Sequence, residues 1–220
     1  MLAKVMSSTI NGVDGVPIEV EVDLTLGLPM FSTVGLPDGA VRESKDRVKA
    51  AINNSGYDFP NTKITVNLAP ADVKKSGSGY DLPIALGILA ASGIIKDSIH
   101  PKYCIVGELS LDGAVRPVSG ILPMTLAARE QGLQGIIVPD ANKAEAAIVD
   151  GIDVIPAAFL HQVVEFVAGL KAIEPFSVDR QSLFFDSRIF DVDFDDVKGQ
   201  EHVKRALEIA ASGGHNILIS

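Results

Sequence analysis

The side chains with the clearest chemical potential lie in one short stretch, between Lys74 and Asp81. Two lysines are followed there by Ser76 and Ser78, and a serine hydroxyl beside a lysine amine can act as an activated nucleophile. Glycines separate and follow the serines, and glycine lets the backbone adopt angles that are closed to other residues. The stretch therefore reads as a flexible turn, which is a poor support for a Ser–Lys dyad, and we expect no dyad here.

Asp81 ends this turn and precedes an apolar run from Leu82 to Ala91. Its carboxylate can accept hydrogen bonds from the free amides of a first helical turn, so we predict a helix cap rather than an acid–base residue. A helix that is apolar all round is a buried helix. Strand-like runs at residues 64–68 and 103–106 flank it, which predicts a central helix that crosses between strands.

Metal and disulfide chemistry find little support in the sequence. The four histidines are scattered, with no pair at helical spacing and no cysteine companion: His100, His161, His202 and His215. We therefore expect no metal site. Cys104 is the only cysteine and cannot form an internal disulfide, which favours a cytoplasmic protein. No run of about 18 apolar residues is present, so we expect no membrane span.

The net charge of −9 argues against tight nucleic-acid binding by this chain alone, because free-standing DNA-binding domains are usually basic. Basic residues still gather in two places, and they form our candidate contact to nucleic acid or a partner: Arg42, Lys45, Lys49, Lys74 and Lys75. The first three share one face of a helix predicted at about residues 38–54. The alternative is an ordinary solvated face, in which Glu43–Arg47 and Asp46–Lys49 pair at helical spacing.

The remaining pattern predicts an α/β (α+β) domain at residues 1–170, with strands first and then alternating helices and strands. The expected elements are a hairpin of 3–10 and 16–26, a strand at 31–34, a hairpin at 109–117, helices at 121–131, 142–149 and 160–168, and strands at 135–138 and 153–155. Residues 171–196 are acidic without clean periodicity and read as a linker. Residues 197–211 predict a helix and 215–219 a short strand.

Three long runs, at residues 34–48, 67–86 and 106–120, resemble the amino-terminal domain of the ComM/YifB family of Mg-chelatase-like AAA+ proteins. The resemblance covers essentially the whole chain. It implies a ribosomal protein S5 domain 2-like fold, which this family shares with the Lon protease domain. Aligned by that resemblance, Asp81 stands at the position of the Lon serine and Leu122 at that of the Lon lysine. Both members of the Lon dyad are then absent, so we expect no peptidase activity.

The last 25 residues resemble the start of an AAA+ ATPase module, whose phosphate loop should follow the strand at 215–219. No G-x-x-x-x-G-K-[ST] motif occurs in the sequence. We therefore interpret residues 197–220 as the beginning of an ATPase domain in a fragment of a longer protein. The resemblance implies that Val197, Gly199 and Gln200 lie at the adenine side of a nucleotide site, which cannot hold ATP without the phosphate loop.

The resemblance also implies a function for the parent protein. It would be a cytoplasmic, hexameric, ATP- and Mg-dependent helicase that drives DNA branch migration in natural transformation and recombination. This chain would supply its amino-terminal accessory domain. Two alternatives stay open: a protein-interaction module, and a Mg-chelatase-like motor subunit that acts on a partner other than DNA.

Overall fold

The computed structural model describes residues 1–95, 102–178 and 193–218. The chain divides into two units, Met1–Val178 and Asp179–Ser220. The first unit extends past the boundary that we expected near residue 170. The backbone N–H of Phe176 donates to the carbonyl of Val154 at 2.8 Å, and the side chains of Phe176 and Val178 pack against the core. The segment 171–178 thus belongs to the first unit rather than to a linker.

A seven-stranded sheet with the order β3-β4-β2-β1-β5-β8-β9 forms the centre of the first unit. Its strands are β1 (Leu2–Asn11), β2 (Asp14–Thr25), β3 (Met30–Val34), β4 (Lys63–Ala69), β5 (Tyr103–Ile105), β8 (Gly135–Pro139) and β9 (Asp153–Ala157). The pairs β1–β2 and β2–β4 are antiparallel, and the other four neighbouring pairs are parallel. The predicted first hairpin is confirmed. A separate hairpin joins β6 (Glu108–Leu109) to β7 (Val115–Arg116).

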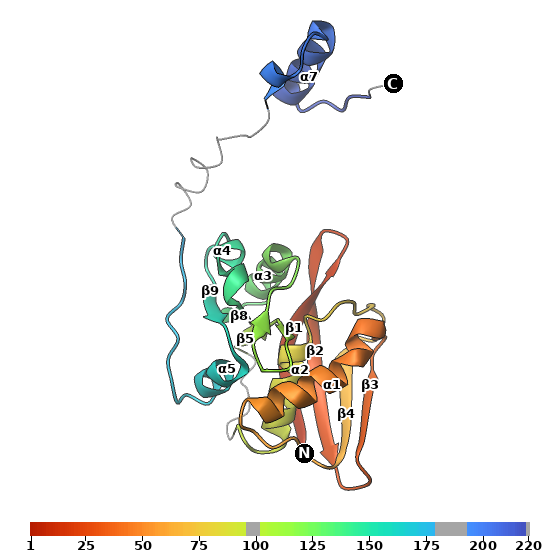
Figure 1. The fold of residues 1–220 in the computed structure, drawn as a ribbon, viewed down its shortest axis with the longest axis vertical. Coiled ribbons are helices and arrows are strands. Elements are labelled where there is room, and N and C mark those ends of the chain that lie inside the picture. The colour runs from red at the N-terminus through yellow and green to blue at the C-terminus, as the bar shows by residue number, and fades with distance from the viewer. Residues whose placement is uncertain (96–101, 179–192, 219–220) are drawn as a thin grey trace. The chain divides into compact units, whose positions relative to one another are not determined.

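The central helix is α2 (Asp81–Ala91), and all 11 of its residues are buried, as its apolar run predicts. It packs on β1 and β2 beside α1 (Gly39–Asn54) (Figure 1). The contact with the sheet is close at Gly87, where an added Cβ would lie 2.5 Å from Cγ2 of Val22. Only glycine fits at this position without a shift of the strand or the helix.

Alternate residues of the parallel strands face two different cores. Ile105, Ile137 and Ile155 belong to the core that also contains α1, α2 and α5 (Leu160–Val167). Their neighbours Cys104 and Ile136 belong to a second core with α3 (Ile121–Glu130) and α4 (Lys143–Ala146). Helices therefore cover both faces at this end of the sheet. Residues 18–23 of β2 and residues 64–68 of β4 instead alternate buried apolar residues with half-buried polar ones, as expected where only one face of a strand is packed.

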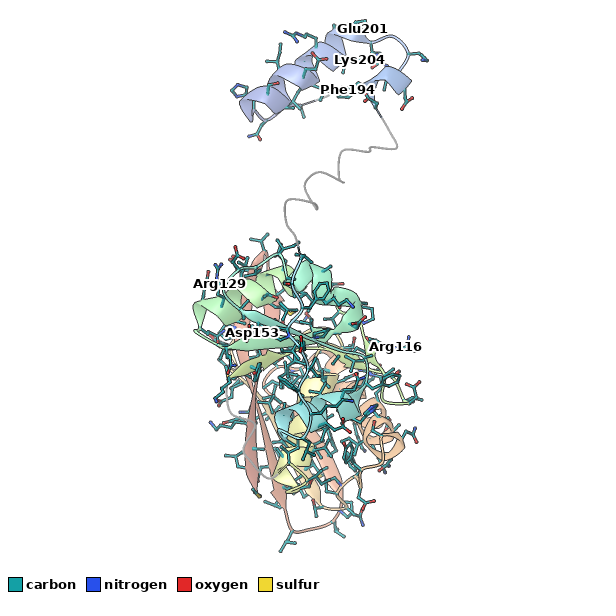
Figure 2. All side chains as sticks on the ribbon, turned by 90° about the vertical axis from the view of Figure 1, so that its left-hand side faces the viewer. Arg116, Arg129, Asp153, Phe194, Glu201 and Lys204 are labelled. Carbon is teal, nitrogen blue, oxygen red and sulfur yellow. The ribbon has the colours of Figure 1, made fainter. Side chains whose placement is uncertain are left out.

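Three predicted elements differ from the structure. The helix expected at 142–149 is shorter, with a 3-10 turn η1 (Asp140–Asn142) followed by α4. The second unit holds a short 3-10 turn, η2 (Phe194–Asp196), and α7 (Glu201–Gly213), which begins later than residue 197. Lys204 and Glu201 form an ion pair at 3.4 Å on α7 (Figure 2). Residues 215–218 pair with no strand among the described residues and take no strand conformation. Residue 219 lies outside the described residues.

None of the helices in the described ranges is long and apolar enough to cross a membrane.

Candidate functional site

The turn before α2 is attached to the start of α1 by hydrogen bonds. The backbone N–H of Lys75 donates to the carbonyl of Leu36 at 3.2 Å, and that of Asp38 donates to the carbonyl of Lys75 at 2.9 Å. The Asp38 carboxylate accepts from the N–H of Val41 at 2.9 Å, which caps α1, and from the N–H of Gly77 at 3.1 Å. One side chain thus begins a helix and also holds the glycine turn.

The two lysines of this turn have opposite environments. Lys74 is exposed, whereas Lys75 is fully buried and its ammonium donates to the carbonyl of Pro70. Burial lowers the pKa of Lys75. Lys75 was one of our candidate nucleic-acid contacts, and its burial removes it from any direct contact with a phosphate. It is also not the partner of Ser78, because the Ser78 hydroxyl donates to the Glu108 carboxylate instead.

Asp81 is not the helix cap that we predicted. Tyr80 occupies the cap position of α2 and makes no side-chain cap bond. The Asp81 carboxylate accepts from Nε of Arg47 at 2.7 Å and from Nη2 at 3.1 Å, and from the N–H of Leu109 at 3.2 Å. A guanidinium that donates two parallel charged hydrogen bonds competes strongly with neutral backbone amides for a carboxylate. Burial raises the pKa of Asp81, and the hydrogen bonds from Arg47 oppose that rise.

Arg47 is the residue of this region that the sequence analysis misplaced. The solvated-face alternative paired it with Glu43, but its side chain reaches inward from α1 to Asp81 on α2. It also donates to the carbonyl of Ala40 at 3.2 Å. The sequence does carry a signal, because Arg47 lies three residues after the buried Ser44, beside the stripe that α1 packs on the core. An arginine at the border of such a stripe can extend its head group to a buried acid.

A cleft of about 400 Å3 opens beside the turn. Its walls come from residues 76–80, the ends of β1 and β5, the β6 strand and residues 117–119. Ser8, Thr9 and Ser119 line it together with the Ser78–Glu108 pair. Tyr80 is also in the wall, and burial raises its pKa to about 12, so it stays protonated at neutral pH. The cleft can bind a polar molecule through hydrogen bonds.

Neither residue at the positions aligned with the Lon dyad offers a nucleophile or a base for acyl transfer. The carboxylate of Asp81 is ion-paired, and Leu122 at the start of α3 has an aliphatic side chain. Among the residues that the structure describes, no group of three or more His, Cys, Asp and Glu could hold a metal ion. His100 lies outside the described residues.

The other basic candidates lie on the outer face of α1. Arg42, Lys45 and Lys49 are exposed, as the helical spacing predicts. Lys49 was expected to pair with Asp46 on a solvated face, and its Nζ lies 5.9 Å from the ring centroid of Phe59. A second, smaller cleft of about 200 Å3 opens there, and both Lys45 and Lys49 line it.

The three residues that we assigned to the adenine side of a nucleotide site precede α7. The N–H of Val197 donates to the carbonyl of Phe194 at 3.1 Å. Gly199 and Gln200 have φ angles of 75° and 58°, and left-handed backbone is uncommon for a residue such as glutamine. The Gln200 carbonyl accepts from the N–H groups of Val203 and Lys204 and so begins the helix.

Comparison with known proteins gives two family matches along the chain. Residues 20–142 match the family described as "Subunit ChlI of Mg-chelatase", and residues 193–220 match "Magnesium chelatase, subunit ChlI". The chain is 44% identical over 209 residues to the protein YifB of Escherichia coli, which covers 94% of this chain and 40% of YifB. It is 41% identical over 219 residues to the competence protein ComM of Haemophilus influenzae, which covers 99% of this chain and 43% of ComM.

A more distant likeness links the chain to a protease. Lon protease 2 of Bacillus subtilis is 26% identical over 165 residues, which cover 67% of this chain and 29% of the Lon protein. The mixed sheet, the buried α2 and this likeness define the first unit as Lon-like, in the ribosomal protein S5 domain 2-like class that the resemblance implied.

Fold and matches together define a Mg-chelatase-like protein of the AAA+ class. Within that class the chain belongs to the ComM/YifB family. It spans about 40% of the length of the curated relatives that it matches.

Proposed function

We propose that this chain is the amino-terminal accessory part of an ATP-driven, hexameric DNA motor that promotes branch migration during natural transformation and recombination. The main support for this proposal is that one chain matches both Mg-chelatase families, at residues 20–142 and at residues 193–220. The alignment with ComM, a protein that is named for competence, covers 99% of this chain.

The first unit serves this motor by assembly or strand handling rather than by chemistry of its own. Three of the side chains that we considered for a nucleophilic dyad have other partners. Asp81 is paired with Arg47, Lys75 donates to a backbone carbonyl, and Ser78 donates to Glu108. A nucleophile must be within hydrogen-bond reach of its base, and these contacts separate the lysine from the serine.

In this proposal, ATP and Mg are bound by the longer protein rather than by this chain alone. Val197, Gly199 and Gln200 would stand at the adenine end, and the phosphates would need a loop that this sequence does not contain. We therefore expect the 220-residue chain neither to bind ATP tightly nor to hydrolyse it. Micromolar ATP affinity of the chain in calorimetry would contradict this expectation.

DNA is the proposed substrate, and its contacts are the exposed basic residues Arg42, Lys45, Lys49 and Lys74. One copy offers few phosphate contacts on a chain of net charge −9, so a single copy should bind weakly at physiological salt. A ring presents every copy around one axis, and linked weak sites then act together through their effective concentration. Affinity should accordingly rise steeply with assembly in the cytoplasm.

The deciding experiment measures ATP hydrolysis by the full-length protein with and without forked DNA, and the salt dependence of DNA binding by the full-length protein and by this chain. We expect forked DNA to stimulate hydrolysis and the isolated chain to bind weakly. Submicromolar binding by the monomeric chain at 150 mM salt would make the first unit a DNA-binding domain in its own right.

The polar cleft beside the turn favours one alternative, a module that binds another protein or a partner other than DNA. ATP hydrolysis that is indifferent to every DNA tested would favour that alternative, and a Mg-chelatase-like motor with a different substrate would then be the better description.

A further inference from the structure

A groove lies between α1 and the edge strand β3, in a region that the polar cleft does not reach. Its volume is about 200 Å3, and we call it the Phe59 groove. The residues that matter for its chemistry are Phe31, Lys45, Lys49, Asn53, Phe59 and Asn61. They come from β3, from the exposed side of α1 and from the segment that leads into β4. Both phenylalanines are only partly buried, although they pack against the main core.

The positive charge of the groove lies next to its aromatic surface. Lys45 and Lys49 are one helical turn apart on α1, and Lys49 Nζ is 5.9 Å from the centroid of the Phe59 ring. No carboxylate is among the residues described as lining the groove. Asp46 and Asp58 are close in sequence but are not among the lining residues.

Asparagine side chains add hydrogen-bonding groups of a specific kind. The side-chain oxygen of Asn53 accepts from the backbone N–H of Phe59 at 3.2 Å, which holds the ring-bearing segment against the end of α1. This contact uses the oxygen and leaves the amide N–H groups as the donors that Asn53 can offer. Such donors match the carbonyl and ring-nitrogen acceptors on the edges of nucleic-acid bases.

We propose that the Phe59 groove binds single-stranded DNA, with an unpaired base against the phenylalanine surface and the adjoining phosphates at Lys45 and Lys49. Aromatic rings beside lysines form the usual surface for single strands, because every base has a face that can stack. A base inside a duplex has no free face, so the groove selects unpaired strands such as those at a branch point. This inference rests on the proposed function, since it takes DNA as the substrate.

The test measures binding of fluorescein-labelled thymidine oligonucleotides to the full-length protein by anisotropy. Replacing Phe59 with leucine retains an apolar side chain and removes the stacking surface. Stacking contributes about 1–3 kcal/mol per base, so Phe59→Leu should weaken binding at least about fivefold, and Phe59→Trp should retain it. Lys45→Ala combined with Lys49→Ala should weaken binding further and reduce the slope of log affinity against log salt by about 1.4, because each phosphate contact to a single strand contributes about 0.7.

Lys143 offers a matched control. It also lies over a phenylalanine ring, with Nζ 5.2 Å from the centroid of Phe176, but it is paired with Asp140 and belongs to α4, which packs on β8 and β9 at the other end of the sheet. Lys143→Ala should leave binding unchanged. If Phe59→Leu binds as tightly as the unchanged protein, or if Lys143→Ala has the same effect as the groove variants, the inference is wrong.

Two further outcomes separate this inference from the proposed function. If forked DNA stimulates ATP hydrolysis and the groove variants bind single strands normally, the groove inference fails while the proposed function stands. If DNA does not stimulate hydrolysis at all, the proposed function fails. If a poly-glutamate peptide displaces the oligonucleotide and itself binds more tightly, the groove is a site for acidic protein segments and the inference is overturned.

Discussion

The two helices that meet at the centre of the first unit each begin beside an aspartate, but the two aspartates have different roles. Asp38 precedes α1 and accepts a hydrogen bond from the N–H of Val41, which is a local cap. Asp81 is the first residue of α2 and bonds to Arg47, 34 residues earlier in the chain. Asp38 remains half-buried, while the Asp81 side chain is 1% exposed.

The comparison shows that burial decides what a carboxylate at a helix start does. A partly exposed carboxylate can cap the helix because water supplies its remaining hydrogen bonds. A buried carboxylate needs a countercharge, because desolvation of an isolated charge is far more costly than the loss of one cap bond. α2 is therefore fixed to α1 by an ion pair, while α1 is capped by its own sequence.

Removing the countercharge should have the largest effect. Arg47→Met keeps an extended apolar stem but leaves the Asp81 carboxylate buried without its partner. Breaking a buried pair from one side costs about 3–5 kcal/mol of unfolding free energy. Urea unfolding followed by circular dichroism measures the change. The double variant Arg47→Met/Asp81→Leu removes both charges and should recover part of the loss, whereas an equal loss in both variants would show that packing matters more than charge.

The cost of that variant should depend on pH. Burial raises the pKa of Asp81 in the folded state from its ordinary value of 3.8, so protonation favours the folded protein. For such a group, stability falls as the pH rises through the folded pKa. Without Arg47 the folded pKa rises further, so the stability difference between wild type and Arg47→Met should be smaller at about pH 5 than at about pH 8. A difference that is independent of pH would mean that Asp81 does not titrate in this range.

Gly87→Ala should destabilise the packing of α2 to an intermediate degree. The added Cβ would lie 2.5 Å from Cγ2 of Val22, so the helix or the strand must shift, at a cost of about 1–3 kcal/mol. Gly39→Ala on α1 is the matched control, because nothing lies within 4 Å of its added Cβ, and it should be nearly neutral. Urea unfolding of the two variants measures the difference, and equal stability of Gly87→Ala and Gly39→Ala would contradict the close contact at Gly87.

Asp38→Ala should have the smallest effect of these substitutions. It removes the cap of α1 and the bond to Gly77, and lost caps typically cost about 1 kcal/mol. Asp38→Asn keeps an acceptor oxygen and should lose less. Thermal unfolding of the two variants gives the comparison, and an alanine variant as unstable as Arg47→Met would show that the clamp on the turn, rather than the cap, is the main role of Asp38.

Local patterns predicted much of the fold. Alternation in residues 16–24 gave the β1–β2 hairpin, and the apolar run at 82–91 gave a fully buried helix. These features can be predicted because the burial of an element determines how often apolar side chains recur along it. The same local reasoning assigned Asp81 to a cap and Arg47 to Glu43, and both assignments were wrong, because spacing along a helix contains no information on a neighbouring helix.

The Phe59 groove shows the same limit. The sequence indicated a basic face at Arg42, Lys45 and Lys49, but it did not predict that Phe59 lies beneath Lys49. Phe59 follows the end of α1 and returns to it only because the chain turns after residue 55 and Asn53 captures its backbone N–H. Likewise, Phe176 is held to the first unit by a backbone hydrogen bond to β9 and by apolar packing. The sequence around it is acidic and aperiodic, so it does not indicate these contacts.

The clamp between residues 36–38 and 75–77 has a consequence for the motions of the unit. Its backbone bonds join the start of α1 to the turn before α2, and Asp38 adds a side-chain bond across the same junction. Segments joined in this way open together, so the amide hydrogens of Asp38 and Lys75 should exchange with solvent at matching rates. DNA bound along α1 and a molecule bound in the polar cleft would then both oppose the opening of these joined segments. Binding at either site should therefore slow amide exchange at the other.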